Sequence, residues 1–167
     1  MINDISAGRL DSAMMATVAK HKVPYIMMHM RGTPQTMKTL TDYDDFIKDI
    51  RYYFSERVSA ARAHNINDLI IDAGFGFAKN IQQNFQLLAH FELFQTFGLP
   101  LLAGLSRKSM IYKTLKTDAE NALNGTTALH MVALQKGASI LRVHDVKEAQ
   151  ECILLHQELQ ASQIQPS

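Results

Sequence analysis

Polar side chains follow each of five short apolar segments of the chain, at the point where each segment ends. If these segments are parallel strands, their carboxyl ends meet at one edge of the sheet, where side chains and helix amino termini converge on ligands. One polar residue at such a place is typical of a helix cap, but five groups in equivalent places predict one shared pocket. The residues are Asn3 and Asp4, His29 and Arg31, Asp72, Ser106 to Ser109, and Arg142, His144 and Asp145.

Asp72 is the first candidate for ligand recognition. It ends an apolar run and precedes a glycine-containing segment, 73–79. Its carboxylate would accept two N–H donors from a guanidine-like heterocyclic edge, a two-point contact that a neutral amide does not match. The alternative is a loop carboxylate that accepts backbone N–H groups. The segment is not a dinucleotide fingerprint, because Lys79 occupies the third glycine position, and we expect Phe75 and Phe77 to form walls.

Cations follow the fourth and fifth apolar runs. Arg107 and Lys108 are adjacent at a strand-to-helix turn, which suits an anion or an electron-rich ring. Ser109 comes next, where a substrate carboxylate would meet free N–H groups. The alternative is a solvated basic turn. Arg142 and His144 are two residues apart and therefore on one side of a strand, which predicts a phosphate site. The alternative for His144 is a packed core histidine.

Neighbouring residues have simpler interpretations. Asp145 is expected to be the N-cap of the following helix. Met28, with the methionines beside it, is expected in the barrel wall, where it would also press against a flat ring. His29 has no histidine or carboxylate at metal-ligand spacing, which argues against a zinc site. The segment 104–109 lacks the glycine spacing of a nucleophile elbow or a Walker A loop. Cys152, the single cysteine, fits a helical core position and a reducing compartment.

Apolar runs alternate with helical periodicity, which predicts a parallel α/β sheet. We expect strands at 1–5, 24–29, 68–72, 100–104 and 139–143. Helices are expected from 11 or 12 to 20, around 47–61, and at 82–94, 107–115, 118–135 and 145–159, with Gly98 and Gly137 as helix stops. Periodicity alone leaves two arrangements open, a doubly wound sheet and a portion of a TIM barrel.

The composition gives no sign of a nucleic-acid or membrane partner. The chain is 47% hydrophobic and 20% charged, and its net charge is +1. No apolar run approaches the roughly 18 residues that span a bilayer. Asn3, Asp4 and Arg9 interrupt any apolar segment typical of a secretory leader, so we expect a cytoplasmic protein. We expect one domain over 1–167, with a frayed tail at about 160–167.

Together, these segments resemble the dihydropteroate synthase family of pterin-binding (β/α)8 barrels along nearly the whole chain. Each segment alone is a weak signal, but five in the family's order, at matching intervals, are specific. The resemblance implies a partial TIM barrel of about five parallel strand–helix units. The matching segments are Ile2 to Ser6, Met28 to Pro34, Asp72 to Asn80, Gly104 to Ser109, and Arg142 to Val146.

The resemblance also implies an activity. In the family, 4-aminobenzoate attacks the methylene of 6-hydroxymethyl-7,8-dihydropterin diphosphate and releases diphosphate, with Mg²⁺ assisting. The family further suggests a homodimer through C-terminal helices. On this basis the substrate-binding residues would be Asn3 and Asp72 at the pterin's amino-pyrimidine edge, Lys108 and Met28 around its ring, Phe77 and Ser109 at the aminobenzoate, and Arg142 and His144 at the diphosphate, with Arg142 also beside the pterin.

Two departures from the family pattern stand out. Ala73 occupies the place of a usual proline, which should loosen the turn while keeping Asp72. The family's first three strands, which carry the main Mg²⁺ ligand and two mobile loops, have no counterpart before Met1. We therefore expect this chain to be inactive or nearly inactive alone, and either to be poorly soluble or to associate through two unpaired sheet edges. On this interpretation we expect Met1 to be an internal methionine of a longer protein.

Two other functions remain open at this point. A methyltetrahydrofolate methyltransferase is also a pterin-binding barrel and would share the roles of Asn3 and Asp72. It has no need of the anion sites at 106–109 and 142–144. The second alternative is a non-catalytic fragment that binds pterin without turnover.

Overall fold

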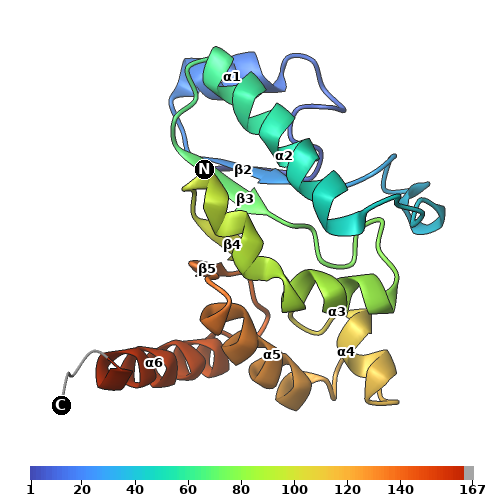
Figure 1. Ribbon diagram of the computed structural model, residues 1–167, viewed down its shortest axis with the longest axis vertical. Coiled ribbons are helices and arrows are strands. Elements are labelled where there is room, and N and C mark those ends of the chain that lie inside the picture. The colour runs from blue at the N-terminus through green and yellow to red at the C-terminus, as the bar shows by residue number, and fades with distance from the viewer. Residues whose placement is uncertain (164–167) are drawn as a thin grey trace.

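The computed structural model describes residues 1–163 and contains one five-stranded parallel sheet. Its strands are β1 (Ile2–Asp4), β2 (Tyr25–Met28), β3 (Leu69–Asp72), β4 (Leu101–Ala103) and β5 (Ile140–Leu141). They pair in chain order, β1-β2-β3-β4-β5, and Figure 1 shows β2 to β5 following one another down the molecule. A doubly wound sheet reverses its direction of winding near the middle, whereas a barrel winds in one direction. The expected partial TIM barrel is therefore confirmed.

Six α-helices alternate with these strands over residues 1–163. They are α1 (Met14–His21), α2 (Phe46–Ala63), α3 (Ile81–Ala89), α4 (Ser109–Thr114), α5 (Leu123–Gln135) and α6 (Val146–Gln163). Two 3-10 segments, η1 (Met37–Thr39) and η2 (Phe91–Phe97), were not expected from the sequence. In η2 the positions i and i+3 eclipse, which places Phe91 and Phe94 together in the core.

Several predicted helix boundaries were wrong for local reasons. The side chain of Asp11 accepts from Ala13 N at 2.9 Å, and this turn delays the start of α1 to Met14. Asp118 accepts from Asn121 N at 2.9 Å in the same way, ahead of α5. At the other end, α6 continues to Gln163, so the expected tail is helical over 160–163, and the rest of it, 164–167, lies outside the described residues.

The three central strands, β2, β3 and β4, are buried on both faces, which is typical of a parallel sheet. Tyr25, Met27, Leu69 and Ile71 belong to the main core together with residues of the helices. The opposite face carries a smaller cluster of Ile26, Ile70 and Leu102, with Ile140 packed against it. In a barrel this second face points inward.

The inward face leads directly to the functional edge. Two residues beyond Ile26 and Ile70 come Met28 and Asp72, which are paired in the register of β2 and β3. Both are therefore on the inward face at the carboxyl ends of their strands.

Among residues 1–163, the structure has no helix with the combination of length and apolar character that a membrane span requires.

Candidate functional site

Asp72 is the buried centre of the carboxyl edge. Its side chain is fully buried, and Oδ1 accepts from Gly74 N at 2.9 Å. Arg142 Nη1 lies 2.9 Å from Oδ2 as an ion pair, but the contact lacks hydrogen-bond geometry, and Oδ2 has no other partner among residues 1–163. A buried carboxylate oxygen without a hydrogen bond carries a desolvation cost on the order of 1–3 kcal/mol or more. Oδ2 is thus available to a donor from a ligand.

Arg142 connects three strand ends. Besides its ion pair with Asp72, its Nη1 donates to Asn3 Oδ1 at 3.3 Å. The guanidinium lies against Gly104, where an added Cβ would be 2.5 Å from Nη2. The structure therefore brings together a residue of β1, the last residue of β3 and the residue that follows β5, of which the first and the last are 139 positions apart. Because the Arg142 side chain is 40% exposed, its free N–H groups remain accessible to an anion.

Lys108 closes the same group from the loop after β4. Its Nζ donates to the carbonyl oxygen of Phe75 and lies 4.6 Å from the centroid of the Phe77 ring. The pKa of Lys108 is lowered to about 8, chiefly by burial. The negative charge of Asp72 works in the opposite direction, and the positive charge of Arg142 contributes to the lowering. Asn3, Asp72, Lys108 and Arg142 thus share one carboxyl edge, as the sequence predicts.

Lys79 fixes the loop between β3 and α3, and the sequence analysis missed this role. Its buried Nζ contacts His29 Nδ1 at 3.0 Å and donates to the carbonyl oxygens of Gly74 at 3.0 Å and Phe77 at 2.9 Å. When Lys79 is protonated, its ammonium group only donates, so Nδ1 of His29 then accepts and the imidazole is neutral. Burial, followed by the charges of Lys79, Arg31 and a further arginine, holds the pKa of His29 well below its ordinary value.

The lowered pKa of Lys79 provides a test of its contacts with this loop. Burial lowers this pKa to about 7 from an ordinary 10.5. Between these values the unfolded chain binds more protons than the folded chain, so the free energy of unfolding rises with pH, by up to about 1.4 kcal/mol per pH unit. We expect Lys79→Met to reduce this slope in urea unfolding between pH 7 and 9.5. Lys113→Met, on the exposed side of α4, should keep it. An unchanged slope in Lys79→Met would contradict the assignment.

Other polar residues at the strand ends are used within the fold. Asp4 accepts from Tyr25 Oη at 2.6 Å and from Ser6 N and Oγ, both at 2.8 Å. Burial works to raise the pKa of Asp4, but these hydrogen bonds outweigh it and lower the pKa. Arg31 stacks 4.3 Å from the Tyr43 ring centroid. The prediction that all five strands contribute polar groups to one pocket was therefore wrong for β2, whose His29 and Arg31 have partners elsewhere.

Three further expectations are corrected by the contacts. Phe75 is not a pocket wall: it is fully buried in the main core, 5.7 Å from the ring centroid of Phe91. Arg107 does not present a free cation, because its guanidinium is paired with the carboxylate of Asp145. The expectation for Asp145 holds in part: it directly precedes α6 and its carbonyl oxygen accepts from Ala149 N, as in an N-cap, but its side chain bonds Arg107.

The remaining predicted site residues lie around this edge. Ser109 lines an open cavity of about 680 Å³ together with Gly76 and Lys79. His144 contacts Ser106 Oγ through Nδ1 at 2.9 Å and makes no hydrogen bond to Asp72. Met28 is fully buried beneath Gly74, consistent with a place in the barrel wall.

Comparison with known proteins gives a consistent result. The model of the pterin binding enzyme family matches residues 1–144. The dihydropteroate synthase of Synechocystis sp. is 45% identical over 156 residues, which cover 91% of this chain and 54% of the relative. That of Escherichia coli K12 is 41% identical over 155 residues, with coverages of 92% and 55%. The chain thus spans about half the length of these relatives.

Solved structures agree in fold. The Yersinia pestis dihydropteroate synthase with a sulfonamide drug complex superimposes with a TM-score of 0.92 at 39% identity, over 96% of this chain and 59% of that one. The Thermus thermophilus enzyme in complex with 6HMPPP gives 0.90 at 32% identity, over 94% and 63%. Asp72 faces inward, the strands follow one another in one direction, and the family model and the solved structures match. The chain therefore belongs to the family of pterin binding enzymes.

Proposed function

We propose that this chain carries the pterin-recognition part of a dihydropteroate synthase of folate biosynthesis. In this reaction the amine nitrogen of 4-aminobenzoate attacks the methylene carbon of 6-hydroxymethyl-7,8-dihydropterin diphosphate. The carbon–oxygen bond breaks, its electron pair leaves with the diphosphate, and a proton of the amine passes to water. The observation that carries the proposal is the buried Asp72 carboxylate with an unsatisfied Oδ2 beside Arg142.

Recognition of the pterin would depend on Asp72 and Asn3. The amino-pyrimidine edge has adjacent N–H donors, and a buried carboxylate accepts such a pair with charge-assisted hydrogen bonds. Asn3 is held beside it through Arg142 and can both donate and accept. Lys108 and Met28 would bound the ring, with Lys108 placed over Phe77. No covalent nucleophile is needed, because positioning two substrates and stabilising a leaving anion account for the catalysis.

The anionic groups would bind at the rim of this site. Arg142 is the partly exposed cation closest to Asp72, and together with His144 it would receive the departing diphosphate. Ser109 borders the 680 Å³ cavity, whose charged lining residues are all lysines, and the carboxylate of 4-aminobenzoate would lie there beside Phe77. The lining charges favour an anion at this place.

In this proposal, Mg²⁺ would bind through the diphosphate of the substrate. Within residues 1–163 no group of three or more histidine, cysteine, aspartate or glutamate side chains is arranged to hold a metal ion. The described residues therefore do not fit a protein-built Mg²⁺ site, and Mg²⁺ usually binds through substrate phosphates with few protein ligands. The ion would enter with its diphosphate.

The proposal extends to a cytoplasmic homodimer. Three leucines of α6, Leu154, Leu155 and Leu159, are 62%, 62% and 48% exposed, and apolar helix faces of this kind are typical of subunit contacts. Light scattering should give twice the mass of the 18.8 kDa chain. A monomer at all concentrations would contradict this part.

Calorimetry tests the proposed function. We expect 6-hydroxymethyl-7,8-dihydropterin diphosphate to bind and a methylated tetrahydrofolate not to bind, since only the first carries a diphosphate for Arg142 and His144. The reverse preference would favour a methyltetrahydrofolate methyltransferase, and no binding of either would contradict the proposal.

The 54% coverage of the first relative supports a second candidate, a pterin-binding chain without turnover. A diphosphate-release assay with 4-aminobenzoate distinguishes the two.

A further inference from the structure

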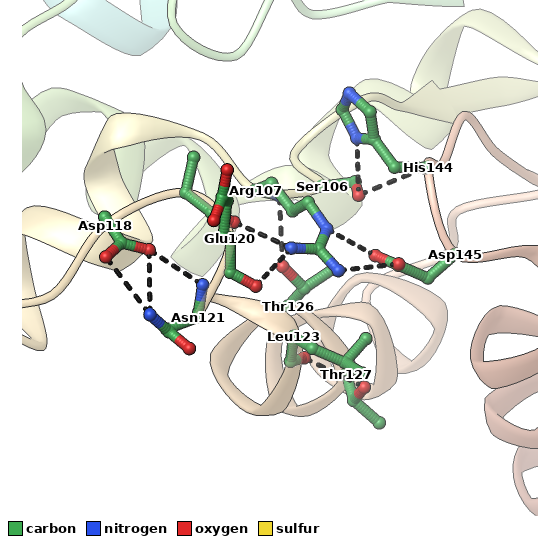
Figure 2. Close-up of polar contacts among 11 residues, drawn as sticks. Ser106, Arg107, Asp118, Glu120, Asn121, Leu123, Thr126, Thr127, His144 and Asp145 are labelled. Atoms are coloured by element: carbon green, nitrogen blue, oxygen red, sulfur yellow. Dashed lines mark hydrogen bonds and ion pairs between the residues drawn. The ribbon is translucent and has the colours of Figure 1, made fainter.

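Arg107 and Asp145 form a two-point ion pair between the loops that follow β4 and β5. Arg107 Nε donates to Asp145 Oδ2 at 2.8 Å, and Nη2 donates to Oδ1 at 2.7 Å. Figure 2 shows the planar guanidinium facing the carboxylate edge to edge. The side chains are only 22% and 18% exposed, so the pair is better shielded than an ordinary surface salt bridge. A fork of this kind fixes orientation as well as distance.

The other donor groups of Arg107 also form hydrogen bonds within the fold. Its Nη1 donates to the carbonyl oxygens of Ala119 and Glu120, in the turn before α5. Its backbone N donates to Thr126 Oγ1 at 3.0 Å, within α5. Its backbone is in the left-handed region with a φ of 53°, which a non-glycine residue adopts at a cost of about 1 kcal/mol or more. The four side-chain donor contacts leave Arg107 unsuited to binding an anion and stabilise its unusual backbone.

A second contact joins the same two loops. Ser106 Oγ meets His144 Nδ1 at 2.9 Å and accepts from His144 N at 3.2 Å. These contacts matter because β5 has only two residues in its register with β4. Arg142 comes directly after this short strand, and Lys108 directly after Arg107. The two cations that flank Asp72 are therefore each within three residues of a member of the Arg107–Asp145 pair.

We propose that Arg107 and Asp145 are positioning residues, which hold Lys108 and Arg142 in register over the Asp72 carboxylate without touching the ligand themselves. Arg107 fixes the turn from which Lys108 reaches Phe75 and Phe77. Asp145 ties the end of β5, with Arg142, to that turn. The effect on ligand affinity rests on the proposed function, but the placement of Lys108 does not.

Two variants separate charge from geometry. Arg107→Lys keeps the positive charge but removes the guanidinium group that pairs at two points with the carboxylate. Asp145→Asn keeps the size and shape of the side chain but removes its negative charge. In both, we expect Lys108 to be released toward solvent, so that its pKa rises from about 8 toward 10.5. This is measured by NMR titration of ¹³C-labelled lysine, with the Lys108 signal identified by its absence from Lys108→Met. General destabilisation of a folded chain would not move this titration.

Affinity for inorganic diphosphate provides the second measurement. We expect it to fall about tenfold in both variants, because misplacing a binding group by about 1 Å has effects of this size or larger. Glu151→Gln makes the same change as Asp145→Asn, from carboxylate to amide, at an exposed position of α6, and should leave both measurements unchanged.

The outcomes distinguish this inference from the proposed function. If the unsubstituted protein does not bind diphosphate, the proposed function fails, and the Lys108 titration still decides whether the pair positions that residue. If Lys108 titrates at the same pH in the unsubstituted protein and both variants, the inference is wrong. Circular dichroism confirms that each titrated sample is folded, and should Asp145→Asn not fold, Arg107→Lys alone decides.

Discussion

Asp72→Asn is expected to weaken the binding of 6-hydroxymethyl-7,8-dihydropterin diphosphate by at least about a hundredfold. The carboxylate is fully buried, and its Oδ2 has no hydrogen bond to the part of the chain that the structure describes. Two charge-assisted hydrogen bonds of about 1.5–3 kcal/mol each would be lost or weakened, and an amide nitrogen would face the donors of the ligand. Isothermal calorimetry of the two proteins under the same conditions measures the change.

The stability of this variant should change much less than its affinity. Arg142, the ion-pair partner of Asp72, is 40% exposed and can be solvated when the carboxylate charge is removed. Asp118→Asn is the matched control, because that carboxylate lies in an exposed turn and accepts from Asn121, away from the site. Should Asp72→Asn bind the pterin as tightly as the control does, Asp72 is not the recognition residue.

The sequence was sufficient to predict the arrangement of strands and which residues end them. Five apolar runs with intervening helical periods require parallel strands, and alternation then places Asp72 and Arg142 on the inward face. Side-chain direction in a strand depends only on local geometry. For this reason the meeting of Asn3 with Arg142, 139 positions later, was predictable from the sequence once the sheet was assumed to be an arc.

The partner of each polar side chain was not predictable in the same way. Arg107 and Lys108 are adjacent cations in the sequence, but one bonds Asp145 and the other lies over Phe77. Which of two neighbours turns toward the pocket depends on the left-handed backbone at Arg107, and no periodic pattern encodes that angle. Lys79 was missed because a buried lysine requires acceptors that only the folded loop supplies.

Gly74→Ala is expected to lower the free energy of unfolding by about 2–5 kcal/mol. Gly74 has a φ of +72°, where an L side chain costs about 1–2 kcal/mol, and an added Cβ would overlap the carbonyl oxygen of His29. That oxygen belongs to backbone beside β2, so relief of the overlap requires the loop to move, at a further cost of about 1–3 kcal/mol. Urea unfolding at constant pH measures the total.

Gly98→Ala isolates the steric part of this effect. Gly98 has a similar φ of +62°, but nothing lies within 4 Å of its added Cβ, so only the backbone cost of about 1–2 kcal/mol remains. The excess in Gly74→Ala then measures how closely the loop is packed on β2. Since Gly74 N also donates to Asp72 Oδ1 and its carbonyl oxygen accepts from Lys79, displacement of this loop should weaken pterin binding as well. Equal destabilisation by the two substitutions would show that the loop relaxes freely, and that the buried carboxylate is not held in place by the backbone of β2.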